Sequence, residues 1–173
     1  MAIRTPTTEE FFNWRSAHGF KNRRWRYAAT VHTPLERLDW FVPTLLATIS
    51  PIRDAVIRIT QVVFEPKALN AHCETQGVAP PVADTPALRV DTAAELSGLL
   101  QAVFADWLDF GVYIIPARLA LAADHDEWTR VFAHSKSDLS PVSSTLKAGG
   151  IRVIEPPHRL GTMRTGRLTT WDD

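Results

Sequence analysis

One stretch of the sequence gathers side chains that could ionise or bind a metal ion, ADHDEWTRVFAHS at residues 123–135. It contains Asp124, His125, Asp126 and Glu127 in succession, and such groups serve as general acids and bases or as metal ligands. A metal site needs side chains that converge on one point, whereas neighbours in a tight turn diverge. The apolar runs on both sides, RLALAA and WTRVFA, favour a polar turn between two strands. We therefore expect a hairpin tip, whose acids could contact a partner.

Two further arrangements could suggest catalysis. Asp106 and Asp109 resemble a catalytic carboxylate pair in their spacing, but we expect both on the polar face of a helix, where they would be solvated. His72 and Cys73 are the residue types of a thiol nucleophile and its base, yet sequence neighbours seldom bring their functional atoms within hydrogen-bond reach. Local motifs therefore predict no catalytic residue, no cofactor and no metal site.

The basic and aromatic segment KNRRWRY, residues 21–27, is a pattern also found in proteins that bind single-stranded nucleic acid. Strand alternation gives a simpler interpretation, with Trp25 and Tyr27 facing the core and Arg24 and Arg26 on the outer face. The formal net charge is zero, which offers little long-range attraction for phosphate. Nucleic-acid binding therefore stays a minor alternative.

Helix starts are marked by a Thr followed three positions later by Glu, a capping box that satisfies free backbone N–H groups. Such boxes at 7–10, 33–36 and 92–95 open three predicted helices, and Ser137 caps a fourth that ends at Gly149 and Gly150. Pro43 should kink or split the second helix. The clearest helix follows 92–95, because its apolar residues repeat at three-and-four spacing.

Short apolar or alternating runs predict strands between the helices. They lie at 23–32, 55–64, 111–115, 118–123, 128–133 and 151–154. The order α-β-α-β-α-β-β-β-α-β, with adjacent strands at 111–133, predicts an α+β fold with a mostly antiparallel sheet and helices packed on it. Residues 66–89 should form a long surface loop. We expect one domain over 1–155 and a loosely held tail over 156–173.

Length and composition bound the class of protein. A chain of 173 residues with 45% hydrophobic residues is typical of one globular domain. Its one cysteine excludes an intramolecular disulfide, which fits a reducing compartment. The N-terminal residues lack the apolar core of a signal peptide, and the uncharged stretch 40–52 is too short to span a bilayer. These features predict a cytoplasmic protein.

The middle of the chain is acidic: residues 84–127 hold Asp84, Asp91, Glu95, Asp106, Asp109, Asp124, Asp126 and Glu127 against Arg89 and Arg118. This organisation, with the hairpin ADHDEWTRVFA followed by a helix and a strand, resembles the immunity proteins that neutralise bacterial polymorphic or contact-dependent toxins. The resemblance implies one tightly bound toxin domain, with its active site covered or an essential surface blocked.

The resemblance carries no position-by-position assignment, so charge and expected exposure supply the candidate contacts. They are Asp106, Asp109, Asp124, Asp126 and Glu127, which would complement a basic toxin domain and speed association. An alternative is a small-molecule enzyme whose pocket gathers His32, His125, His134, Asp124 and Cys73 from separate elements. A second alternative is a nucleic-acid module that uses the face of Arg24 and Arg26.

Overall fold

The computed structural model describes residues 3–21, 24–80, 87–116, 119–156 and 163–164. Five α-helices lie in this part of the chain, α1 (Thr8–Ala17), α2 (Leu38–Ile49), α3 (Lys67–Thr75), α4 (Ala93–Ala105) and α5 (Lys136–Ala148), with a 3₁₀ turn η1 (Leu35–Arg37). The strands are β1 (Arg24–Trp25), β2 (Tyr27–His32), β3 (Asp54–Gln61), β4 (Ala87–Val90), β5 (Asp109–Ile115), β6 (Leu119–Ala123), β7 (Trp128–Ala133), β8 (Val153–Ile154) and β9 (Met163–Arg164).

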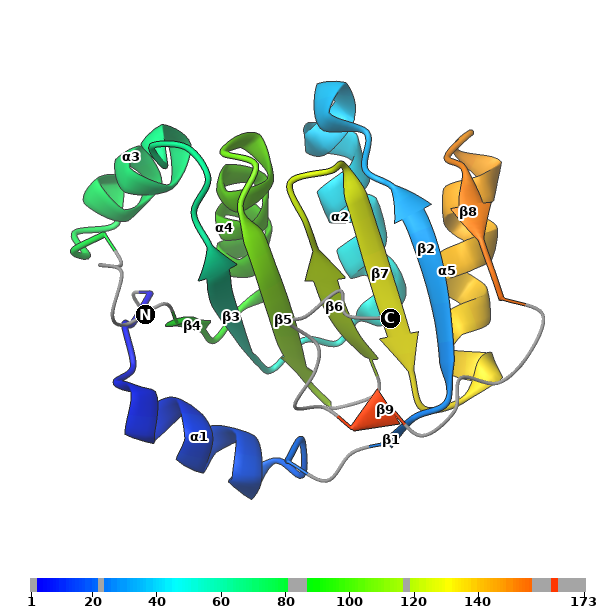
Figure 1. Ribbon diagram of the computed structural model, residues 1–173, viewed down its shortest axis with the longest axis horizontal. Helices are drawn as coiled ribbons and strands as arrows, with labels where there is room; N and C mark the ends of the chain where they lie inside the picture. Colours follow the sequence, from blue (N-terminus) through cyan, green and yellow to red (C-terminus); the bar gives the residue numbers. More distant parts are fainter. Residues whose placement is uncertain (1–2, 22–23, 81–86, 117–118, 157–162, 165–173) are drawn as a thin grey trace.

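Seven strands form one antiparallel sheet in the order β4-β3-β5-β6-β7-β2-β8. The larger core lies between this sheet and helices α2 to α5, and Figure 1 shows α2, α4 and α5 side by side behind the strands. The opposite face carries a smaller core, which α1 covers with Phe11 and Trp14. The predicted α+β fold with a mostly antiparallel sheet is confirmed.

Local capping signals explain several helix starts. Thr7 with Glu10 and Thr92 with Glu95 form complete capping boxes at the starts of α1 and α4, as predicted. The prediction at Ser137 is wrong by two residues, because the hydroxyl of Ser135 accepts the N–H of Asp138 and caps α5.

The predicted capping box at 33–36 does not form. The Thr33 hydroxyl is buried and bonds the hydroxyl of Thr129 at 2.7 Å instead of capping a helix. The chain therefore enters through the 3₁₀ turn, and α2 begins at Leu38. Pro43 lies inside α2, which continues past it to Ile49 and is not split.

The expected surface loop at 66–89 is contradicted by α3 and β4. Leu69 and Cys73, four residues apart, lie on one face of α3 and are fully buried in the larger core. β4 pairs with β3 in antiparallel register from Ala87 to Val90 and forms an edge of the sheet. The sequence pattern did not reveal either element, because a nine-residue helix with two buried apolar residues and a four-residue strand carry little periodic signal.

The strand predicted over 23–32 is interrupted at Arg26. Trp25 packs in the smaller core with Ala28, whereas Tyr27 and Val31 belong to the larger core, so Trp25 and Tyr27 lie on opposite faces. The prediction that both face one core is therefore wrong. The interruption at Arg26 divides the predicted strand into β1, which pairs with β9, and β2, which pairs with β7.

The predicted tail over 156–173 is described in two places. Pro156 and β9 belong to the described residues, and β9 pairs with β1. The remainder of the predicted tail lies outside the described residues, and the boundary at 155 stays a prediction. None of the helices described combines the length and hydropathy needed to cross a membrane.

Candidate functional site

The residues 124–127 form the turn between β6 and β7, as predicted. The carboxylate of Asp124 accepts the backbone N–H groups of Asp126 and Trp128, both at 3.1 Å. Partial burial raises the pKa of Asp124, and these two backbone hydrogen bonds oppose that rise. Asp124 therefore shapes the turn from inside.

Asp109 supports the same turn from β5. Its carboxylate accepts the backbone N–H and the Nδ1–H of His125, both at 2.8 Å. The hydrogen bond to Asp109 raises the pKa of His125. The prediction that Asp109 is solvated on a helix is wrong, because α4 ends at Ala105 and Asp109 begins β5, where its side chain is largely buried.

The prediction that Asp106 is solvated is also wrong, since this residue is 9% exposed. Its carboxylate accepts the backbone N–H groups of Ala68 at 2.9 Å and Leu69 at 2.7 Å. These N–H groups belong to the first turn of α3, and the residue at the N-cap position before the helix, Pro66, makes no side-chain cap. Asp106 thus caps a helix that is 37 residues away in sequence.

Two acids at this end face solvent. Asp126 has a side chain that is 77% exposed. Glu127 is partly exposed and pairs with Nε2 of His32 at 3.2 Å, and its φ of 65° places it in the left-handed region. The ring of Trp128 packs edge-on against His32 with centroids 5.3 Å apart. The structure therefore divides the five predicted contact acids into three that hold the fold and two that are accessible.

Exposed hydrophobic side chains lie at the same end of the sheet as these acids, and the sequence reasoning missed them. The exposed fractions are 52% for Val62, 39% for Val63, 62% for Phe64 and 40% for Trp107. The available signal was the run VVFEP at 62–66, three apolar residues placed after the alternating part of a strand. The predicted strand 55–64 includes the first part of this run, whereas β3 ends at Gln61.

Backbone contacts place the segment that holds Val62, Val63 and Phe64 at the same end of the sheet as Trp107. Segment 62–66 leaves β3 where Gln61 pairs with Asp109, and it reaches α3 where Asp106 caps the helix. Trp107 lies between those two aspartates and lines a small hollow with Asp124, His125 and Glu127. Figure 1 shows the β3–α3 connection, the start of β5 and the β6–β7 turn at the same, upper end of the sheet.

Trp107 has an unusual backbone conformation, with a φ of 56°. It follows the last turn of α4, where the N–H of Leu108 bonds the carbonyl of Val103 at 3.1 Å. Glycine usually occupies this left-handed position, because a side chain there costs about 1 kcal/mol. A half-exposed tryptophan held at such a position suggests a role beyond packing.

The residues of the alternative hypotheses do not converge. His32, Asp124 and His125 lie at the upper end of the sheet, His134 follows the far end of β7, and Cys73 lies on the buried face of α3. Burial raises the pKa of the Cys73 thiol. Within the described ranges no three His, Cys, Asp or Glu side chains are placed to hold a metal ion. Arg26 is exposed, and the side chain of Arg24 lies outside the described residues.

We call the exposed group at the upper end of the sheet the turn-end surface: Val62, Val63, Phe64, Trp107, Asp126 and Glu127. A scan against protein-family models gives no match, and comparisons with curated proteins and with solved structures give no significant match. Function therefore has to be inferred from the chemistry of the surfaces described.

Proposed function

We propose that this chain is a protein-binding module that acts as an immunity protein and neutralises a basic toxin domain through the turn-end surface. The observation that carries the proposal is that four exposed hydrophobic residues, Val62, Val63, Phe64 and Trp107, lie at the same end of the sheet as the acids of the hairpin turn (Figure 1), with Trp107 directly beside those acids. Contiguous exposed apolar side chains rimmed by polar groups are typical of protein interaction sites.

Aromatic residues supply the expected centre of the contact. Trp107 and Phe64 present large rings to solvent, and tryptophan is enriched among the residues that contribute most to protein–protein affinity. Covering these rings with a partner would remove apolar area from water at roughly 25 cal/mol per Å² before the costs of association. We therefore expect Phe64 and Trp107 to contribute more to affinity than the acids do.

The accessible acids define the chemistry of the partner. Asp126 and Glu127 lie at the rim, where exposed charges mainly accelerate association and exclude wrong partners. Asp106, Asp109 and Asp124 are engaged in hydrogen bonds within the fold, so we infer that they act by positioning the surface rather than by touching the partner. A partner with a basic rim and an apolar centre fits this arrangement.

The turn is already fixed before any partner binds. Asp109 holds His125 through two hydrogen bonds, and Asp124 closes the turn through two more. A surface that needs no reordering loses less conformational entropy on binding, which favours tight association. This supports a tight inhibitory complex of the immunity type.

Co-expression tests the proposal directly. The C-terminal domain encoded by the neighbouring gene is expressed alone and together with this chain, and we expect it to arrest growth alone and to be harmless in the pair. Phe64→Lys should abolish the rescue, whereas Ile154→Lys, a matched change at an exposed hydrophobic residue of β8, should preserve it. The immunity proposal fails if the neighbouring domain is not toxic or if wild-type chain gives no rescue.

Association kinetics test the role of the acidic rim. Asp126→Asn removes one exposed negative charge at the turn-end surface, and Glu9→Gln removes one on α1. We expect Asp126→Asn to slow association roughly two- to fivefold at low salt with little effect at high salt. Equal association rates for the two variants would assign no role to the rim charge.

A further inference from the structure

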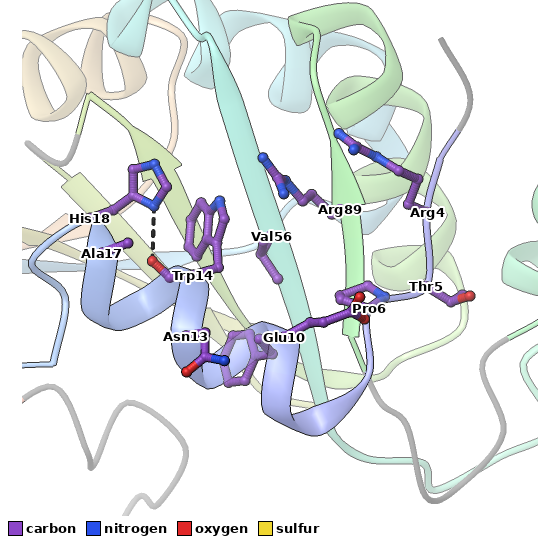
Figure 2. Close-up of a pocket in the computed structure, with 11 residues that line it drawn as sticks. Arg4, Thr5, Pro6, Glu10, Asn13, Trp14, Ala17, His18, Val56 and Arg89 are labelled. Atoms are coloured by element: carbon purple, nitrogen blue, oxygen red, sulfur yellow. Dashed lines mark hydrogen bonds between the residues drawn. The ribbon is translucent and has the colours of Figure 1, made fainter.

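A separate pocket of about 610 Å³ lies where α1 crosses the sheet near β3 and β4. Arg4 and Pro6 of the N-terminal segment, Trp14 and His18 of α1, Val56 of β3 and Arg89 of β4 contribute to its lining. Figure 2 shows these side chains arranged around one opening. The volume lies within the range of small-molecule sites, about 300–1,000 Å³.

Arg89 is held rigidly beside the pocket. Its Nε–H and Nη2–H donate to the two carboxylate oxygens of Asp54 at 3.0 and 2.7 Å, and Asp54 also accepts the indole N–H of Trp14 at 2.8 Å. Guanidinium has five N–H groups, so this fork leaves three on Arg89 that do not engage Asp54. The hydrogen bond to Asp54 raises the pKa of Arg89, which stays charged.

Arg4 lines the same pocket from the N-terminal segment. Its backbone exchanges two hydrogen bonds with Arg89, at 2.9 and 2.8 Å, which fixes the segment along the outer edge of β4. Its Nη2 contacts Oδ1 of Asp91 at 2.5 Å, so one of its five N–H groups is used in this pair. The two guanidinium groups therefore line one pocket, each positioned by a carboxylate behind it.

The rest of the pocket offers an apolar floor and several polar groups, Thr5, Glu10, Asn13 and His18. Phe11, Trp14 and Val56 form the floor and belong to the smaller core. His18 donates Nδ1–H to the carbonyl of Trp14 at 2.8 Å, because a carbonyl can only accept. Its Nε2 is therefore the acceptor of the neutral ring, and it becomes a second donor if the ring is protonated.

We propose that this pocket binds a small organic carboxylate with an apolar or aromatic body. The carboxylate accepts hydrogen bonds from the N–H groups of Arg4 and Arg89 that face the pocket, because guanidinium is well matched to carboxylate geometry. The body packs on the floor of Phe11, Trp14 and Val56. This site lies on the opposite face of the sheet from α2 to α5, and its role is independent of the turn-end surface.

Local charge sets the expected affinity. Asp54 and Asp91 balance the two arginines, and the carboxylate of Glu10, which accepts the backbone N–H of Thr7, adds a negative charge to the lining. Recognition therefore relies on placed N–H donors and on water exclusion rather than on a net positive field. For a ligand of about ten non-hydrogen atoms, we expect a dissociation constant on the order of 1 mM or tighter. A larger natural carboxylate that fills more of the pocket would bind more tightly.

Titration of the intact chain with benzoate and phenylacetate, followed by amide NMR spectra, tests the proposal. We expect shifts centred on α1, β4 and the segment around Arg4, and no comparable shifts with benzamide, which has the same ring without the charge. Arg4→Gln should weaken benzoate binding about tenfold. Arg152→Gln, an exposed arginine near the opposite edge of the sheet, is the matched control and should leave binding unchanged.

A second variant tests the volume of the pocket without changing a charged residue. Ala17 lines the pocket at the exposed end of α1, so Ala17→Leu adds volume there without removing a hydrogen bond, and we expect it to weaken benzoate binding at least about threefold. The proposal is overturned if neither carboxylate gives shifts at the pocket, if benzamide binds as well as benzoate, or if both pocket variants bind like Arg152→Gln. Toxin neutralisation is read separately, so either proposal can fail alone.

Discussion

Removal of the Asp106 carboxylate should destabilise the fold, although the sequence predicts this residue to be a solvated surface acid. In Asp106→Ala the N–H groups of Ala68 and Leu69 lose their acceptor at the start of α3. Hydrogen bonds to a charged group contribute about 1.5–3 kcal/mol each, and water can replace part of this at a site that is 9% exposed. We expect a loss of about 3 kcal/mol for Asp106→Ala and about 1–2 kcal/mol for Asp106→Asn, which keeps one acceptor oxygen.

Urea unfolding of the whole chain measures this loss. A decrease of about 3 kcal/mol corresponds to a melting temperature lower by roughly 6–12 °C in a chain of this size. Asp126→Ala, which removes an exposed acid nearby, should stay within about 0.5 kcal/mol of wild type. Amide exchange at Ala68 and Leu69 should accelerate in Asp106→Ala. If Asp106→Ala is as stable as Asp126→Ala, Asp106 does not cap α3, and the structural role given to it here is wrong.

Three further outcomes are expected. Trp107→Gly should have a free energy of unfolding within about 1 kcal/mol of wild type, because relief of the left-handed strain offsets the lost packing. The same variant should weaken toxin binding at least about 30-fold, as measured by calorimetry. The interaction of protonated His125 with Asp109 raises the pKa of His125, so its contribution to stability should be fully present below about pH 6.5 and should be lost as pH rises through the raised pKa. NMR titration should place the pKa of His125 above 6.5, and Asp109→Asn should remove the shift. Cys73 is fully buried, so a thiol reagent should label it at least about a hundredfold faster in urea than in the folded chain.

Much of the fold could be predicted from local signals. The capping boxes at Thr7 and Thr92 and the polar turn at 124–127 each depend on a few neighbouring residues, and the structure contains all three. The capping box at 33–36 failed because the Thr33 hydroxyl finds a partner 96 residues away on Thr129. Local propensity cannot anticipate such a competing tertiary contact.

The candidate site was less predictable than the fold, for the same reason. Asp106 and Asp109 look alike in the sequence, yet one caps a distant helix and the other holds a histidine of the hairpin turn. Their environments depend on where α4 ends, and helix boundaries are poorly determined by pattern alone. The exposure of Phe64 and Trp107 likewise depends on the packing of three separate connections at one end of the sheet.

The affinity of the purified toxin domain for three forms of this chain tests the central proposal most directly. By calorimetry, we expect tight binding to wild type, a loss of at least about 30-fold for Phe64→Lys, and unchanged binding for Ile154→Lys, which places the same charge on an exposed hydrophobic residue elsewhere. Equal affinity for all three forms would contradict the proposal that the turn-end surface binds the partner.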